Sequence, residues 1–457
     1  MSTQVRSSSR ALVVRSHVWL ATSTVVLSLV GVACAPNSAS SASAACSATI
    51  PQVAVKFSEA EFLDDTPHII GVTQGYFKKV GITLSPPPIG SVHTPSTHAS
   101  LFLNGTEDVI ATNYGELLPA VQYASNLRMF AYGDFFVGYA IMGKPSFKSF
   151  SELVAGGMDK DTALKTAIGQ LSGHTLSWSL GPATRDPGKA LFELAGVPLS
   201  SINQLSLPDA EGVQQMLAGR SDFLIDGAAG TITLLKAGFK RIIGAADLTG
   251  LVKPPFDSPS STTILALVVT NGIGTTLGYY QKNPDTVMRL AAVEWAISQY
   301  IHDHPDLAAP VHVAQLNRVA GTSLTEADAK IVYSTIDPYI QFTDQGPLWF
   351  DDPAKPTFEL NMIQALINSK VTSGAFKPGV VKPENITMAA EIYHKAVDLK
   401  KQTDSLLAQV QSGSSSASSD KQAAAQKLVQ SAKDYYNMFD YLDSQRFACA
   451  ANKTLTS

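Results

Sequence analysis

From Pro51 onward the chain alternates short apolar runs with stretches of helical periodicity, and this alternation limits the fold more than any other feature. The clearest unit lies in mid-chain. HTLSWSL is typical of a strand and GPATR of a loop. DPGKALFELAG predicts a helix capped by Asp186 and ended by Gly196, and INQLSL predicts the next strand. This order predicts parallel pairing with right-handed crossovers, so we expect an α/β fold.

The same reasoning places further elements on either side of this unit. We expect strands at VAVKF, ITLSPP, DVIATN, SDFLIDG, KRIIGA and STTILALVV, the last over Ser261–Val269. Beyond about Asp337 the pattern is mainly helical. Two amphipathic stretches, Pro383–Gln411 and Lys421–Leu442, flank a Ser/Gly run that reads as a connector between helices.

The N-terminus has the marks of a secretory signal. Arg6, Arg10 and Arg15 precede an uncharged apolar run, Val18–Cys34. An uncleaved membrane anchor is the alternative, but the run is marginal in length and contains Ser and Thr. The segment resembles a bacterial lipoprotein signal, which implies lipidation of Cys34. We therefore expect a signal peptide at 1–33 and a Ser/Ala-rich tether at 34–50.

The cysteine count and the net charge exclude several classes of protein. Three cysteines are too few for a disulfide scaffold or a four-thiolate metal site. In an exported chain Cys46 and Cys449 are expected to form a disulfide that joins the two ends of the folded body; two buried, unpaired thiols are the alternative. The net charge of −4 would become about −7 once the signal arginines are removed, so we expect no nucleic-acid partner.

Ligands of open α/β sheets bind at the carboxyl ends of the strands, and these loops supply the candidate site. Arg185 is the one guanidinium among them and could hold a carboxylate, sulfonate or phosphate; an ion pair with Asp186 or a plain surface charge is the alternative. Asp64, Asp65 and Asp226 could bind an amine, although helix capping ranks first. The candidate ligand-binding residues are Ser58, Asp64, Asp65, Thr66, Thr112, Asn113, Tyr114, Thr184, Arg185, Asp226 and Ser258.

Aromatic residues near these loops, such as Phe135, Phe136 and Trp178, could stack on a planar ligand, but core packing is the expected role of each. Motifs of catalysis are missing from the body: it has no G-x-S-x-G, P-loop, G-x-G-x-x-G or H-E-x-x-H string. Its histidine pairs supply too few ligands for zinc. We therefore expect no catalytic residue, no cofactor and no metal.

Four segments in order resemble one family. They are IIGVTQGYFKKVGITL, LSGHTLSWSLGPATRDPGKALFELAGV, GVQQMLAGRSDFLIDGAAG and YYQKNPDTVMRLAAVEWAISQYIHDHPD. They are similar to elements of solute-binding proteins of ABC transporters for nitrate, sulfonate and taurine, a family that includes thiamine-precursor binding proteins. The resemblance implies a two-lobed periplasmic-binding-protein-like fold of type 2. Each lobe would be a mostly parallel sheet flanked by helices, and two crossing strands would join the lobes.

On this resemblance we expect lobe 1 at 51–142 and 258–340, lobe 2 at 143–257, and a C-terminal helical region at 341–457. The implied function is capture of a small organic anion or heteroaromatic solute between closing lobes, with delivery to a membrane permease. A monomer anchored by lipid at the outer face of a membrane, or free in a periplasm, is expected. The alternatives are an enzyme on the same scaffold, similar to menaquinone-precursor enzymes or pyrimidine synthases, and an accessory surface lipoprotein or sensor.

Overall fold

The computed structural model describes residues 46–457 except 94, 180–181, 250–261, 373 and 415–416. The predicted signal peptide, the lipidation site Cys34 and the candidate ligand residue Ser258 lie outside the described residues. None of the described helices is long and apolar enough to cross a membrane.

The first sheet gathers strands from the two ends of the α/β region in the order β2-β1-β4-β11-β5, with β3 paired to β1. Parallel pairing joins β1 to β2, β3 and β4, whereas β11 runs antiparallel to β4 and β5. The strands are β1 (Val53–Ala60), β2 (Ile82–Ser85), β3 (Ser91–His93), β4 (Val109–Asn113), β5 (Leu127–Tyr132) and β11 (Asn271–Thr276).

The second sheet uses the intervening stretch in the order β10-β6-β9-β7-β8. Here β7 is parallel to β8 and β9, and β6 is antiparallel to β9 and β10. Each sheet is therefore mostly parallel, as predicted, and contains one strand that runs in the opposite direction: β11 in the first sheet and β6 in the second. Both reversed strands follow the connections between the sheets. The strands are β6 (Ala140–Gly143), β7 (Thr175–Ser179), β8 (Asn203–Leu207), β9 (Phe223–Asp226) and β10 (Lys240–Gly244).

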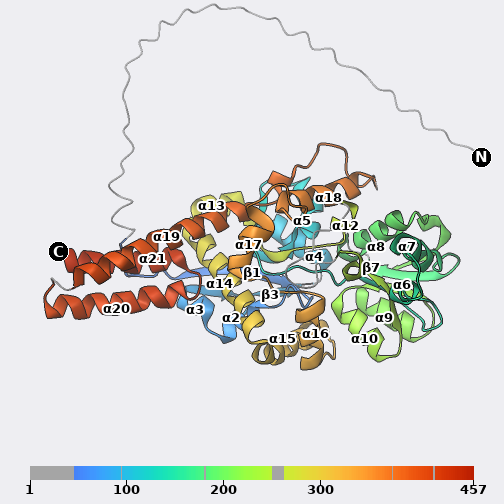
Figure 1. Ribbon diagram of the computed structural model, residues 1–457, viewed down its shortest axis with the longest axis horizontal. Helices are drawn as coiled ribbons and strands as arrows, with labels where there is room; N and C mark the ends of the chain where they lie inside the picture. Colours follow the sequence, from blue (N-terminus) through green and yellow to red (C-terminus); the bar gives the residue numbers. More distant parts are fainter. Residues whose placement is uncertain (1–45, 94, 180–181, 250–261, 373, 415–416) are drawn as a thin grey trace, which may run out of the picture. The chain divides into compact units, whose positions relative to one another are not determined.

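Helices pack on both sheets (Figure 1). The helices grouped around the first sheet are α2 (His68–Thr73), α3 (Tyr76–Lys79), α4 (Pro95–Leu103), α5 (Tyr114–Val121), α13 (Leu277–Lys282), α14 (Pro284–Asp303), α15 (Pro305–Ala320) and α16 (Glu326–Thr335). Those grouped around the second sheet are α6 (Phe150–Ala155), α7 (Lys160–Gly169), α8 (Pro182–Ala195), η1 (Leu199–Ser201), α9 (Asp209–Leu217), α10 (Ala228–Lys236) and α11 (Ala245–Thr249). Most of α14 is buried, because apolar residues occur on nearly every side of it.

Backbone hydrogen bonds tie together the segments that connect the two sheets. Phe136 and Val269 exchange N–H···O bonds of 2.8 and 3.1 Å, so the two crossing segments pair with each other. A third segment runs alongside them, since the amide of Val137 donates to Ile336 O at 2.9 Å. The expected strand over Ser261–Val269 is wrong: α12 (Thr262–Leu265) occupies its start. A short continuous apolar run fits a buried helix as well as a strand.

The lobe boundaries stay an interpretation. Residues 53–132 and 271–276 supply the strands of the first sheet, and residues 140–244 supply those of the second.

The C-terminal region is helical, and a segment of it between two helices pairs with β5 at the edge of the first sheet. The amide of Met129 in β5 donates to Ile386 O, and the amide of Met388 donates back to Met129 O, both at 2.8 Å. This pairing protects the exposed edge of β5. The elements are α17 (Phe342–Gln345), η2 (Gly346–Phe350), α18 (Glu359–Thr372), η3 (Pro383–Asn385), α19 (Ala389–Gly413), α20 (Ser419–Tyr436) and α21 (Tyr441–Thr456).

The last three helices, α19, α20 and α21, lie side by side (Figure 1) and share small apolar contacts of their own. Ala425 and Ala451 pack with Val410, and Ala432 and Ala448 allow a similar close approach. Cys46 and Cys449 form a disulfide with their Cα atoms 4.9 Å apart, which joins the start of the described chain to α21.

Candidate functional site

Residues at the end of β4 form hydrogen bonds with the first turn of α5. The Asn113 side chain accepts a hydrogen bond from the Glu116 amide at 3.0 Å, and Thr112 Oγ1 donates to Glu116 Oε2 at 3.1 Å. Asn113 is therefore the N-cap of the helix. Two of the residues predicted to bind a solute thus use these side-chain hydrogen bonds to begin α5.

The loop after β1 brings two acidic side chains close to α5. Asp65 is buried, and neither of its carboxyl oxygens has a hydrogen-bond partner among the described residues. Burial raises the pKa of Asp65 well above its usual range, and the nearby Glu116 and Asp64 raise it further. Burial also raises the pKa of Asp64 to about 6 and that of Glu116 to about 7. Burial without hydrogen-bond partners therefore favours the uncharged form of the Asp65 carboxyl group.

Two further buried acids lie where the connecting segments enter the first sheet. Asn271 Nδ2 donates to Asp134 Oδ1 at 2.8 Å, which joins the first two connecting segments. Asp337, on the third, is fully buried, and its pKa is raised by burial and by Asp134. Sequence reasoning missed Asp134 and Asp337, because an isolated Asp in a loop carries no signal of burial.

Ser58 and Thr66 turn into the interior of the first lobe. Ser58 lies within β1, which runs to Ala60, and not in the loop expected to follow Phe57. Its hydroxyl hydrogen-bonds to His98 Nε2 at 3.0 Å, and burial lowers the pKa of His98 to about 4. Thr66 Oγ1 donates to Phe62 O at 2.8 Å and contacts a second buried histidine. Both hydroxyls therefore have partners inside the protein.

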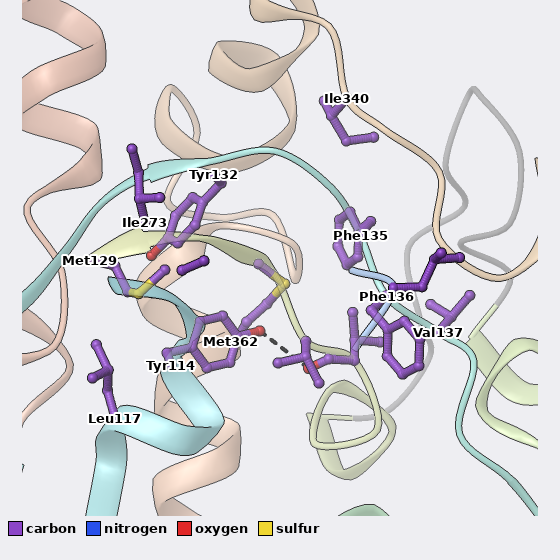
Figure 2. Close-up of a cluster of buried hydrophobic side chains, with 14 of the residues drawn as sticks. Tyr114, Leu117, Met129, Tyr132, Phe135, Phe136, Val137, Ile273, Ile340 and Met362 are labelled. Atoms are coloured by element: carbon purple, nitrogen blue, oxygen red, sulfur yellow. Dashed lines mark hydrogen bonds between the residues drawn. The ribbon is translucent and has the colours of Figure 1, made fainter. Parts of the chain in front are cut away.

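Tyr114 and its aromatic neighbours form part of the core (Figure 2). The Tyr114 hydroxyl donates to Val268 O at 3.2 Å, so it binds the second connecting segment. Phe136 packs edge-on against Tyr139, and the indole N–H of Trp178 donates to Ser206 Oγ at 3.2 Å. These contacts favour the core-packing interpretation of the aromatic residues over a stacking wall.

Thr184 and Arg185 lie in the first turn of α8. The helix begins at Pro182, so Asp186 does not cap it, and Pro187 is inside it. Thr184 is buried, whereas Arg185 is half-buried, with an Nε that has no hydrogen-bond partner among the described residues. Asp186 forms an ion pair with Lys370 of α18, where the sequence suggested Arg185 as the partner. Lys370 carried no sequence signal, because its partner lies 184 positions away.

Asp226 ends β9 and lies over the first turn of α10. Its Oδ1 accepts a hydrogen bond from the Gly227 amide at 2.7 Å. A Cβ on Gly230 would come within 2.0 Å of Asp226 Oδ2, so the carboxylate needs glycine at that position. The N-cap of α10 is Gly227 and no side chain caps this helix, so the helix-capping role expected first for Asp226 is wrong. Its carboxylate still lies at the helix N-terminus, where a negative charge is favourable.

The structure brings some of the candidate residues together and separates others. Asp64 and Asp65 lie near Glu116 at the start of α5, and α5 contacts α8, whose first turn carries Arg185. Ser58, Thr66 and Tyr114 lie in the interior. Among the residues that the structure describes, no three His, Cys, Asp or Glu side chains are arranged to hold a metal ion.

No protein-family model matches the sequence, and no curated protein matches it. Solved structures do match. The nitrate-binding protein NrtA from Synechocystis PCC 6803 aligns over 76% of this chain and 89% of its own, with 11% identity and a TM-score of 0.53.

The sulfonate-binding protein SsuA from Methylobacillus flagellatus KT aligns over 76% of this chain and 95% of its own, with 10% identity and a TM-score of 0.52. A protein from Bordetella bronchiseptica RB50 aligns over 76% and 97%, with 13% identity and a TM-score of 0.50. At such low identity the likeness establishes the fold. The chain therefore has the α/β fold of periplasmic binding proteins, extended by C-terminal helices.

Proposed function

We propose that this chain is an exported solute-binding protein of an ABC importer, and that it captures a small organic anion between its two α/β lobes. The fold supports this proposal, since nitrate- and sulfonate-binding proteins share it. The observation that carries the ligand class is Arg185 in the first turn of α8, with a buried Nε that no described residue binds. A guanidinium at a helix N-terminus favours a carboxylate, sulfonate or similar anion.

The buried acids of the first lobe are compatible with an anionic ligand. Burial raises the pKa values of Asp65 and Asp337 well above the usual range, which favours the uncharged form of each carboxyl group and weakens repulsion of an anion. A heteroaromatic ligand has less support, because Tyr114, Phe136 and Trp178 are buried in the core and are not free to stack. Nothing among the described residues favours the enzyme alternative.

Export and anchoring are proposed from the sequence. The basic segment and apolar run before Cys34 support secretion, and a lipid on Cys34 would hold the body beside a membrane permease. Mass spectrometry of the N-terminal peptide of the mature protein tests both. A peptide that begins at a diacylated Cys34 is expected, and an intact Met1 would contradict the proposal.

A ligand screen tests the solute-binding function. Purified protein is heated with nitrate, alkanesulfonates, aromatic acids and pyrimidines, each at up to millimolar concentration. A ligand at about one hundred times its dissociation constant stabilises the native state by about 2.7 kcal/mol, so a Tm increase of a few degrees is expected from an anion. An absence of stabilisation by every solute would count against the proposal.

Two arginine variants test whether Arg185 is the residue that binds the anion. Arg185→Gln should lose the anion-dependent Tm increase while keeping the Tm of the free protein. Arg220→Gln removes the same charge from an exposed position after α9 and should keep the increase. Equal responses of the two variants would exclude Arg185 as the anion contact.

A further inference from the structure

Helix α18 joins elements of both sheets, although it belongs to neither. It contacts α5 of the first lobe, α8 of the second, and α12 between them (Figure 1). Leu366 marks the contact with α5, since a Cβ on Gly115 would lie 3.6 Å from its Cδ2. The helix is therefore placed to fix the start of α8 relative to the first lobe.

Lys370, near the end of α18, makes the polar contact with α8. Its Nζ donates to Asp186 Oδ2, and the two side chains are only 5% and 16% exposed. The Lys370 carbonyl accepts hydrogen bonds from the Ala375 and Phe376 amides, at 2.9 and 3.0 Å, so the chain after α18 folds back over it. The Phe376 ring lies 5.8 Å from Nζ. Lys370 is thus held at both its backbone and its ammonium group.

The ion pair between Lys370 and Asp186 affects the charge of the candidate site. Asp186 directly follows Arg185 in the first turns of α8. An unpaired carboxylate there would place a negative charge on the same helix end as the guanidinium and would repel an incoming anion. Because Lys370 neutralises Asp186, the positive charge of Arg185 and the helix N-terminus is left to attract a ligand.

We propose that Lys370 is a positioning residue for the solute site: its ion pair with Asp186 holds the first turn of α8 against α18 and neutralises the carboxylate beside Arg185. The inference rests on the proposed solute-binding function and adds to it a role for the C-terminal region. A segment that follows the two sheets in the chain then takes part in forming the site.

Hydrogen exchange of the full-length protein tests the positioning directly and needs no ligand. In Lys370→Met, the amides of residues 185, 186, 188 and 189 should exchange at least about tenfold faster than in the wild type, because removing one partner of a buried pair leaves an uncompensated charge. Lys370→Arg should keep most of the protection. The matched control is Lys330→Met, which breaks an exposed ion pair with Asp306 and should leave α8 unchanged.

A double variant separates positioning from general stability. Lys370→Met with Asp186→Asn leaves no orphan charge, so the Tm should recover toward the wild-type value while the amides of residues 185, 186, 188 and 189 still exchange fast. If those amides exchange at the wild-type rate in both Lys370→Met and the double variant, the positioning role is wrong.

Binding of methanesulfonate, measured by calorimetry, tests the electrostatic part. If it binds the wild type, Lys370→Met should weaken the affinity at least about tenfold and the double variant should regain part of the loss; equal affinities would overturn this part. If methanesulfonate and the other solutes fail to bind the wild type, the proposed function fails, while the exchange rates still decide whether Lys370 positions α8.

Discussion

The guanidinium of Arg289 in α14 binds the carboxylate of Asp443 in α21 through two hydrogen bonds, 2.7 Å from Nε to Oδ2 and 3.0 Å from Nη2 to Oδ1. Both side chains are almost fully buried. Because α14 packs on the first sheet and α21 is the last helix, this pair fastens the C-terminal helices to the α/β body. Such a two-pronged pair fixes orientation as well as distance.

Arg289→Met should therefore loosen the C-terminal helices. It leaves the buried Asp443 carboxylate without its main partner, so we expect a loss of about 3–5 kcal/mol in the free energy of unfolding. Urea unfolding measures the loss, and hydrogen exchange should locate it in α21. Lys401→Met, which removes an exposed ion pair with Asp398, should change stability by less than about 0.5 kcal/mol. Similar losses in both variants would contradict a special role for Arg289.

The disulfide between Cys46 and Cys449 should stabilise the body by closing nearly the whole chain into a loop. The two cysteines are 403 positions apart, and a long loop loses much entropy when it is closed in the unfolded state. Cys46→Ser with Cys449→Ser should lower the free energy of unfolding by about 2–4 kcal/mol. Thiol titration of the unreduced mature protein should find neither cysteine free; two reactive thiols would refute the bond.

His68 lies between two carboxylates, with Nδ1 2.9 Å from Glu59 Oε1 and Nε2 2.8 Å from Glu294 Oε2. Burial opposes the charged imidazole, but Glu294 and Glu59 outweigh it and raise the pKa of His68 to about 10. A raised histidine pKa gives stability that is complete below the unfolded pKa of about 6.5 and is lost as the pH rises toward 10. Wild-type stability should therefore fall between these pH values.

His68→Gln tests this assignment. The variant should be less stable than the wild type at pH 6 by about 3–5 kcal/mol, because two buried carboxylates lose their positive partner. The difference should shrink by pH 10, where the wild-type imidazole has also lost its proton. A difference that stays constant across this range would show that His68 is not charged in the folded protein.

Replacing Glu116 should have the opposite effect to replacing His68: the variant should be more stable than the wild type. Its raised pKa of about 7 means that the folded protein keeps a proton that the unfolded chain releases at about pH 4.5. Stability from this group is complete below pH 4.5 and is lost as the pH rises through 7. Glu116→Gln, a neutral isostere, should be more stable than the wild type at pH 8 by about 1–3 kcal/mol, and close to it at pH 4.5. Thermal unfolding at both pH values measures this, and a destabilised variant at pH 8 would show that the carboxylate is needed.

Local patterns were enough to predict much of the fold. The strands VAVKF, DVIATN, TLSWS and FLID lie where the sequence pattern placed them, since short apolar or alternating runs favour strands whatever their neighbours are. The prediction for STTILALVV failed for the same reason: such a run does not distinguish a buried helix from a strand. The predicted parallel direction holds for the other strands, but the reversed direction of β6 and β11 could not be predicted locally, because it depends on where the chain re-enters each sheet.

The candidate site was predictable only in outline. The strand-end rule selected the stretches that contain Asn113, Arg185 and Asp226, but the structure gives these residues different environments: a helix cap, a half-buried guanidinium and a carboxylate over a glycine. Hydrogen-bond partners of this kind depend on side-chain direction and on neighbouring elements, which local periodicity does not encode.

By itself, the sequence determined an α/β body, a helical C-terminal region and the strand ends at which to look for a ligand, because these follow from short-range periodicity and turn chemistry. Only the tertiary structure decided that Lys370 neutralises Asp186, that Arg289 holds Asp443, and that Asp134 and Asp337 are buried together. Those contacts join residues more than a hundred positions apart, and folding alone determines which distant charges share a low-dielectric interior.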